Sequence, residues 1–278
     1  MRLIDIGVNL IHPSFDKDRE QVLRDAEASG ISPLVITGTN VEESKNARWY
    51  AASHNTPAVK RCFSTAGVHP HDVKMCDENT IAELSELAQM PEVAAIGECG
   101  LDYNRDFSPR NEQRVWFERQ VELAAALNMP LFLHERDAFD DFYAILKKYP
   151  APRKVAHCFT GGEKELDAYL SLGCYIGITG WICDERRGTD LLSLVKKIPS
   201  DRLLLETDAP YLLPRNIREK KRSGRNEPKN LTHIARYIAD IVGKDPAVLA
   251  EETFSASLMF FFDSCEPFSK HELHSGQF

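Results

Sequence analysis

The chain has 278 residues, of which 43% are hydrophobic and 27% charged, and its formal net charge is -8. Its length suits a single barrel of alternating strands and helices, and its composition excludes a disordered chain. The excess of acidic residues argues against general affinity for nucleic acid, because nonspecific binding depends on neutralising phosphates, so any such contact must be local.

Runs typical of strands alternate with runs typical of helices along most of the chain. Short β-rich runs predict eight strands at residues 3–8, 34–37, 62–68, 93–97, 131–133, 154–156, 174–178 and 202–206. Apolar residues at helical spacing predict helices at 16–29, 80–90, 113–127, 138–149, 163–172 and 189–198, and two more at 231–242 and 247–262. This repeat predicts an α/β fold, a single (β/α)8 barrel of the TIM type over residues 1–263. We expect the polar tail, residues 264–278, to be poorly ordered.

The distribution of apolar residues and cysteines bears on location. The sequence contains no run of the roughly 18 apolar residues that cross a membrane, and its first residues lack the apolar region of a signal peptide. The seven cysteines include no C-x-x-C pair, which indicates reduced thiols. We therefore expect a cytoplasmic protein without a membrane partner, and a monomer by default.

Polar side chains fall at the ends of four predicted strands. Glu98 follows the fourth strand, His134 the fifth and His157 the sixth, and Asp208 lies just beyond the eighth. The carboxyl ends of barrel strands meet at one mouth, where active sites form. Each side chain alone has a structural explanation, but two imidazoles with two carboxylates are a ligand set suited to Zn²⁺, Mn²⁺ or Mg²⁺. We therefore predict a site for one or two divalent ions at these four residues.

Three more side chains fall near the same mouth. His69 ends the third strand in register with its inward face, and we interpret it as a phosphate contact or proton donor in preference to a core residue. Arg136, in register with His134, suits a developing phosphate charge, because a guanidinium binds oxyanions in a two-pronged way. His71 follows a proline-forced turn, so its position stays open.

Three residues adjoin the proposed ligands in sequence. Glu206 shares the inward face of its strand with Asp208, and either orients a ligand or a water, or forms a buried pair with an arginine. Cys99 and Cys158 each follow a proposed ligand directly, so strand alternation turns them toward the helices. We therefore do not expect these cysteines to be ligands.

The loop after the eighth strand is basic. Between residues 215 and 227, six basic residues minus two glutamates give a charge of +4, from Arg215, Arg218, Lys220, Lys221, Arg222 and Arg225 against Glu219 and Glu227. The loop is either solvated surface or a guide for a polyanion beside the site, and we predict that Arg225 contacts substrate. Trp181 and Tyr211 either stack on bases or pack against the protein.

Several segments resemble the signatures of TatD-family deoxyribonucleases, which are metal-dependent hydrolases on the amidohydrolase-type barrel. They are GVHPH at 67–71, GECGLD at 97–102, HCFTG at 157–161, ETDAPYL at 206–212 and RNEP at 225–228, and the match runs from residue 2 to about residue 262. The resemblance implies that His69 lies close to the scissile phosphate. It implies the metal ligands Glu98, His134, His157 and Asp208. It also implies 3′ to 5′ exonuclease action on single-stranded DNA, with RNA ends as a further substrate, commonly supported by Mg²⁺.

One motif departs from the family pattern. Many relatives end the first strand with Asp-x-His-x-His, whereas this chain has Gly7 and Asn9 where two metal-binding imidazoles would be. TatD members in the narrow sense resemble this chain in having Asn at the second position, which suggests a subgroup and not a dead enzyme. Asn9 offers one weak oxygen ligand and is predicted to contact substrate, while His12 is expected at the surface.

A divalent ion lowers the pKa of its water and holds a phosphate oxygen. We therefore predict three catalytic residues. Glu98 fixes the ion, Asp208 orients or deprotonates the water, and His69 together with Arg136 stabilises the phosphorane-like charge. The same chemistry at a carbonyl carbon gives the rival interpretation, an amidohydrolase or an aminoacyl-tRNA ester hydrolase. The residues Gly7 and Asn9 also leave open a nucleic-acid-binding or scaffold protein with a decayed site.

Overall fold

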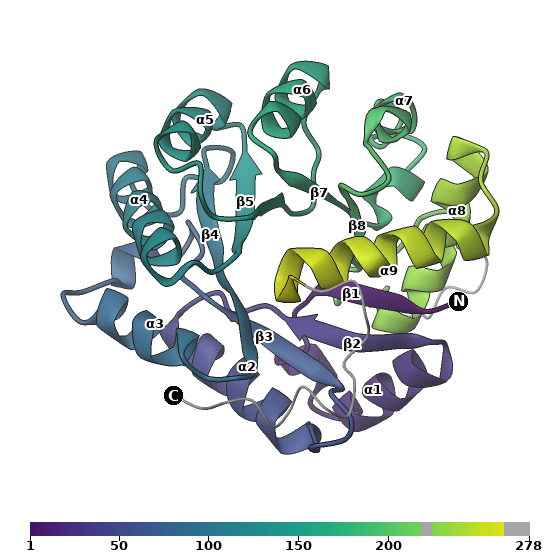
Figure 1. The fold of residues 1–278 in the computed structure, drawn as a ribbon, viewed down its shortest axis with the longest axis horizontal. Coiled ribbons are helices and arrows are strands. Elements are labelled where there is room, and N and C mark those ends of the chain that lie inside the picture. The colour runs from purple at the N-terminus through teal and green to yellow at the C-terminus, as the bar shows by residue number, and fades with distance from the viewer. Residues whose placement is uncertain (218–223, 264–278) are drawn as a thin grey trace.

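The computed structural model describes residues 1–217 and 224–263. Eight parallel strands follow one another in chain order: β1 Leu3–Val8, β2 Ile31–Ile36, β3 Cys62–Ala66, β4 Val93–Asp102, β5 Leu131–Arg136, β6 Lys154–Ala156, β7 Tyr175–Ile178 and β8 Leu203–Leu205. β1 returns beside β8, where the backbone N–H of Asp208 donates to the carbonyl oxygen of Gly7 over 2.9 Å. The chain therefore folds as the predicted (β/α)8 barrel (Figure 1).

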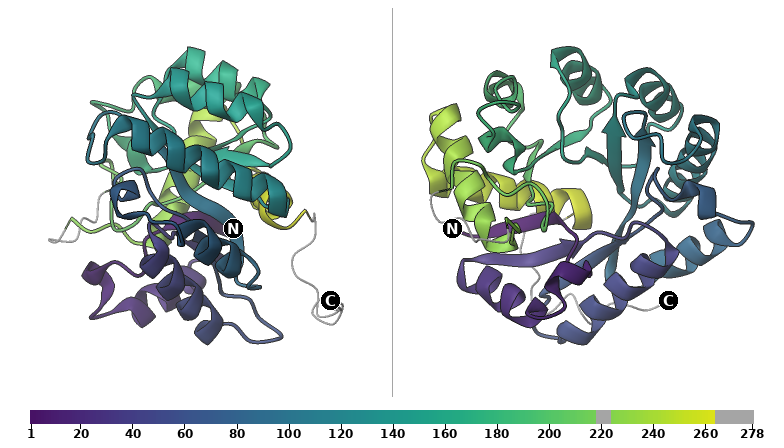
Figure 2. Two further views of the ribbon diagram at one scale, coloured as in Figure 1. Left: turned by 90° about the vertical axis from the view of Figure 1, so that its left-hand side faces the viewer. Right: turned by 180° about the vertical axis from the view of Figure 1, so that it is seen from behind.

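Helices surround the strands as an outer ring, which Figure 2 shows from the side and from behind. They are α1 Arg19–Ala28, α2 Val41–His54, α3 Thr80–Ala88, α4 Arg110–Leu127, α5 Phe139–Lys148, α6 Glu163–Ser171, α7 Leu191–Leu194 and α8 Leu231–Val242, whereas α9 Pro246–Phe262 lies outside this ring. Capping residues set several ends: Asn40 and Asp245 accept backbone hydrogen bonds at the starts of α2 and α9, and Gly243 ends α8 with a φ of 70°. No helix in the described part of the chain is long and apolar enough to cross a bilayer.

No residue range was predicted from the sequence for α2, the helix that follows β2. Its buried residues are Ser44, Ala47, Tyr50 and Ala51, most of which are small or polar. Such a face gives a weak apolar period, because helix prediction depends on large apolar residues at a spacing of three and four. Its start at Asn40 is a typical N-cap and was the available signal.

Several strands differ from their predicted bounds. The predicted strand at 34–37 began after Pro33, because proline is rarely found inside strands. β2 nevertheless begins at Ile31 and includes Pro33. β4 runs to Asp102 and β5 to Arg136, and the two ends pair with each other in register. Glu98 and His134 therefore lie inside strands and not beyond them: His134 pairs with Gly100, and Glu98 lies at a shift of register between Gly97 and Cys99.

Apolar side chains form two layers, one between strands and helices and one inside the barrel. The inner layer includes Ile6, Phe132 and Leu204 of the strands together with Phe260 of α9. Figure 1 shows α9 lying across one end of the barrel. We call this apolar end the floor and the opposite end, where the strands end in polar residues, the mouth.

Candidate metal centre at the barrel mouth

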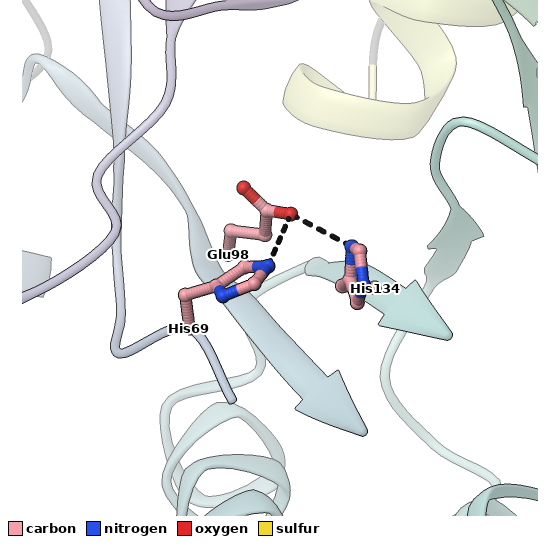
Figure 3. A group of neighbouring side chains, drawn as sticks. All are labelled: His69, Glu98 and His134. Carbon is pink, nitrogen blue, oxygen red and sulfur yellow. Dashed lines mark ion pairs between the residues drawn. The ribbon is translucent and has the colours of Figure 1, made fainter. Parts of the chain in front are cut away.

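Three imidazoles surround one carboxylate oxygen at the mouth. Oε1 of Glu98 lies 2.8 Å from Nε2 of His157, 3.1 Å from Nδ1 of His134 and 3.3 Å from Nε2 of His69. Figure 3 shows Glu98 between His69 and His134, whose donor atoms lie with it within 4.8 Å of one another. Glu98 and His157 are buried. This donor set of nitrogen and carboxylate oxygen fits a divalent ion.

Charge at this cluster is strongly coupled. Burial opposes ionisation of Glu98, but the neighbouring His157 and His69 and a hydrogen bond from His134 hold its pKa well below the ordinary value. Burial also opposes charge on His157, yet the carboxylates of Glu98 and Glu206 raise its pKa well above the ordinary value. Burial lowers the pKa of His69 to about 4, although Glu98 acts in the opposite sense. These directions favour an ionised Glu98 beside a protonated His157.

Asp208 lies at the start of the loop after β8 and lines the same cavity as Glu98, His134 and His157, which has a volume of about 590 Å³. Its backbone has a φ of 52°, a left-handed conformation that is rare for residues other than glycine and is common at functional sites. Nδ2 of Asn9 donates to Oδ1 of Asp208 over 2.9 Å. Burial, helped by the charges of Glu98 and Glu206, raises the pKa of Asp208 to about 7. The structure thus pairs Asn9 with Asp208.

Glu206 is fully buried behind His157. Its Oε2 lies 3.3 Å from Nδ1 of His157, and its Oε1 accepts the backbone N–H of Cys158. A Cβ on Gly7 would lie 2.4 Å from Oε2, and one on Gly177 would lie 2.6 Å from Oε1. The two glycines therefore leave the space that the Glu206 carboxylate occupies, and no side chain fits at position 7 while Glu206 remains there. Of the alternatives that the sequence left open, the structure shows Glu206 orienting His157.

Asp102 is a buried carboxylate that the sequence reasoning did not single out. Its Oδ2 lies 2.7 Å from Nε2 of His71 and 3.5 Å from Nε2 of His134. Burial opposes ionisation, but hydrogen bonds with His134 and His71 hold the pKa of Asp102 below its ordinary value. The signal was alternation: positions 98 and 102 share a face of β4, but the predicted strand stopped at 97.

The remaining candidates divide between the cavity and other parts of the protein. Arg136, Tyr211 and His12 line the cavity with the cluster, so His12 is not simply a surface residue. Cys158 also lines it, contrary to the expectation that it turns toward the helices, because its φ of 46° breaks strand alternation. Cys99 is buried in the outer layer, as expected.

Arg225 binds carboxylates other than those of the cluster at the mouth. Its guanidinium donates to both carboxylate oxygens of Asp18, over 2.8 and 2.7 Å, and to Glu227. These contacts hold the loop after β8 against the start of α1. Arg215 lies 3.6 Å from Asp184, whereas Arg218, Lys220, Lys221 and Arg222 lie outside the described residues.

Comparisons with known proteins agree on one family. The family described as TatD related DNase matches residues 4–262. The chain is 52% identical over 252 residues to the 3'-5' ssDNA/RNA exonuclease TatD of Erwinia billingiae, covering 90% of this chain and 95% of that protein. It is 49% identical over 253 residues to the protein of the same name from Escherichia coli K12, with the same two coverages of 90% and 95%. A crystal structure of a hydrolase TatD family protein from Entamoeba histolytica superposes with a TM-score of 0.85 at 28% identity, covering 95% of this chain and 99% of that one.

Proposed function

The chain belongs to the family of TatD related DNases, a family of metal-dependent hydrolases, and we propose that it removes nucleotides from the 3′ end of single-stranded DNA or RNA. We further propose that Glu98, His134 and His157 hold the divalent ion, and that Asp208 completes the site. Mg²⁺ is the ion that we expect, with Mn²⁺ and Zn²⁺ as alternatives suited to two imidazoles.

The observation that carries this assignment is a carboxylate behind each of two imidazoles. Nδ1 of His157 faces Oε2 of Glu206 at 3.3 Å, and Nε2 of His134 lies 3.5 Å from Oδ2 of Asp102. An ionised carboxylate only accepts hydrogen bonds, so the imidazole nitrogen that faces it carries a proton. The other nitrogen of each ring faces Glu98, over 2.8 Å for His157 and 3.1 Å for His134, and offers a lone pair when the ring is neutral. A divalent ion among Glu98 and the two rings would take the place of the protons in these contacts, and metal-binding histidines are commonly oriented by a carboxylate in this way.

His69 is oriented in the opposite sense. Its Nδ1 accepts the backbone N–H of His71 over 3.1 Å, so in the neutral ring the proton lies on Nε2, which faces Glu98. His69 therefore offers an N–H where the other two rings offer lone pairs. This supports the role of His69 as a donor to a phosphate oxygen, although its donor atom lies as near to Glu98 as that of His134.

When bound, a divalent ion lowers the pKa of a water and polarises a phosphate oxygen. The chain supplies the rest. Asp208, which lines the cavity beside the cluster, accepts a proton from the attacking water, while Asn9 holds its carboxylate in place. The guanidinium of Arg136 and the Nε2–H of His69 stabilise the negative charge that develops on the phosphate.

An assay of nucleotide release tests the proposed function. The chain should release 5′-mononucleotides from the 3′ end of 5′-labelled single-stranded DNA and RNA with Mg²⁺, Mn²⁺ or Zn²⁺, and a chelator should abolish release. Amides, lactones and aminoacyl-tRNA are assayed beside them. Turnover of that panel without nucleotide release would instead favour the amidohydrolase or ester hydrolase.

A matched pair of variants tests the assignment of ligands. Calorimetric titration with Mn²⁺ should show weaker binding to His157→Ala than to the wild type by about 10-fold or more. His69→Ala should bind Mn²⁺ as the wild type does but should lower kcat by about 100-fold, as expected for one lost donor. Equal loss of Mn²⁺ affinity in both variants would make His69 a ligand.

A further inference from the structure

A second cavity lies beside the catalytic one, among residues that follow β5, β6 and β7. It has a volume of about 780 Å³, and its walls include Phe139 of α5, Lys164 of α6 and Trp181. Arg136 lines both this cavity and the catalytic one. We call it the β5–β7 cavity. Its volume lies in the range of pockets that hold small organic ligands.

Arg136 connects the two cavities with an available positive charge. Within residues 1–217 and 224–263, its guanidinium makes no hydrogen bond or ion pair, and its ring contact is with the indole of Trp181, 5.6 Å from the centroid. A guanidinium without a carboxylate partner can bind a phosphate in a two-pronged way. A phosphate held by Arg136 would therefore have one cavity on each side of it.

Trp181 is held in place before any substrate binds. Its backbone N–H donates to Oγ1 of Thr179 and its indole Nε1 donates to the carbonyl oxygen of Arg187, each over 3.2 Å. The guanidinium of Arg187 lies 4.1 Å from the indole centroid and donates to the buried Asp184 over 3.0 Å. The pair of indole and guanidinium forms a stacking surface whose position is already fixed, and nucleobases stack on such surfaces.

The acidic side chains of the β5–β7 cavity indicate which part of a nucleotide it suits. Glu135, Asp141 and Glu165 line the cavity, and each accepts a hydrogen bond from the protein. Asp140 is almost fully exposed at the rim. The basic lining residues Lys164 and Arg187 are themselves paired with Asp140 and Asp184, so the remaining carboxylates repel a phosphate but accept hydrogen bonds from a sugar hydroxyl or a base amine. The cavity therefore suits a neutral nucleoside, while the phosphate stays at Arg136.

We propose that the β5–β7 cavity binds the nucleoside on the 5′ side of the scissile phosphate, with its base stacked on Trp181. This inference rests on the proposed function, because the two nucleosides joined by the scissile phosphate must lie on opposite sides of it. The terminal nucleoside occupies the catalytic cavity, near Tyr211. The penultimate nucleoside occupies the β5–β7 cavity, whose exposed rim at Asp140 and Lys164 lets the strand continue into solvent.

The test combines a variant with altered substrates. The full chain and its Trp181→Ala variant are given short 5′-labelled oligonucleotides that are intact or that lack the base at the penultimate or the 3′-terminal position. kcat/KM is measured for release of the first nucleotide. Trp181→Phe serves as the conservative variant, and Trp49→Ala is the matched control, because Trp49 is 65% exposed on α2.

In the wild type, loss of the penultimate base should lower kcat/KM by about 10- to 100-fold, the usual effect of one stacked base. Trp181→Ala should lower it by a similar factor on the intact strand, and loss of the penultimate base should then change it by less than about twofold. Loss of the terminal base should cost the same in both chains. Trp181→Phe should retain most of the activity, and Trp49→Ala all of it.

Two results would overturn the inference while leaving the proposed function standing. In the first, removal of the penultimate base lowers kcat/KM of Trp181→Ala by the same factor as that of the wild type, or it leaves kcat/KM of the wild type unchanged. In the second, it is the terminal-base effect that disappears in Trp181→Ala. A wild-type chain that releases no nucleotide with any of the three ions would overturn the proposed function and this inference together.

Discussion

The two ends of the barrel are formed by the same eight strands and differ in nearly every chemical respect. At the floor, apolar strand residues such as Ile4 and Leu204 lie in one buried cluster with Phe260 of α9. At the mouth, buried side chains such as Glu98 and His157 have ionised or ionisable partners. A floor of this kind stabilises the fold by burial, whereas the mouth keeps charged groups in costly positions where they can act on a substrate. The comparison predicts that variants at the mouth change activity and that variants at the floor change stability.

The largest effect should follow the loss of charge at Glu98. Glu98→Gln keeps the shape of the side chain but removes the carboxylate that faces three imidazoles. Loss of a bound ion's contribution, several kcal/mol, should lower kcat/KM by at least about 10³-fold. Nucleotide release is the measurement, and far-UV circular dichroism should be unchanged. Glu86→Gln, on the outer face of α3, is the control, and full activity of Glu98→Gln would remove Glu98 from the mechanism.

At the floor, a substitution should lower stability and leave activity unchanged. Phe260→Ala leaves a cavity under the barrel, because Phe260 is fully buried, and should lower the free energy of unfolding by about 3–5 kcal/mol. Urea unfolding measures this loss, while kcat/KM of the folded variant should stay near that of the wild type. Val248→Ala, at an exposed position of the same helix, should change stability by less than about 0.5 kcal/mol. A large fall in kcat/KM for Phe260→Ala would break the comparison.

A smaller effect should come from the carboxylate behind His157. The Glu206 carboxylate accepts hydrogen bonds from the His157 ring and from the backbone N–H of Cys158. In Glu206→Gln, the side-chain NH₂ would face one of these donors and could not accept its hydrogen bond. Variants of this type commonly lose about 10- to 100-fold in metal affinity or activity. Mn²⁺ titration and nucleotide release measure both. If Glu206→Gln lowered stability but left Mn²⁺ affinity and nucleotide release unchanged, Glu206 would have a structural role, as the floor residues have.

The last effect, which is small at any one pH step, concerns the dependence of stability on pH at Asp5, between the two ends. Burial raises the pKa of Asp5 to about 8, although hydrogen bonds from Thr207 act in the opposite sense. The folded chain then keeps a proton that the unfolded chain has lost, so stability from this group is complete below pH 4 and falls as pH rises toward 8, by up to about 1.4 kcal/mol per pH unit. Asp5→Asn should flatten this fall in melting temperature between pH 5 and 8. A slope equal to that of the wild type would contradict the shift.

Much of the fold and part of the site follow from local patterns in the sequence. The alternation of strand and helix runs predicted the barrel because each unit repeats the same short pattern. Glu98, His134 and His157 could be found one by one, because each directly follows an apolar run, and the barrel then brings the three together. The barrel topology brings these three residues, each recognised in its own segment of the sequence, to one site.

Asp102 and several contacts of residues that the sequence analysis did name were missed, because they have no local signal. Asp102 meets His134 only because β4 and β5 extend through polar residues, which no apolar pattern marks. Gly7 makes room for the carboxylate of Glu206, from the opposite end of the barrel sequence. The left-handed backbone of Cys158 is set by the loop around it. Alternation along one strand cannot predict such contacts, since they depend on how neighbouring strands meet.

The junction of β1 with β8 has a consequence for the order in which the protein becomes competent. Asp208 receives its hydrogen bond from Asn9 across 199 positions of sequence, and Thr207 donates to Asp5 across 202. During synthesis, Glu98 and the imidazoles leave the ribosome long before Asp208, and Asn9 has no partner until the last strand docks. A growing chain that has not reached residue 208 therefore lacks the residue that we propose as the proton acceptor, together with the partner of Asn9.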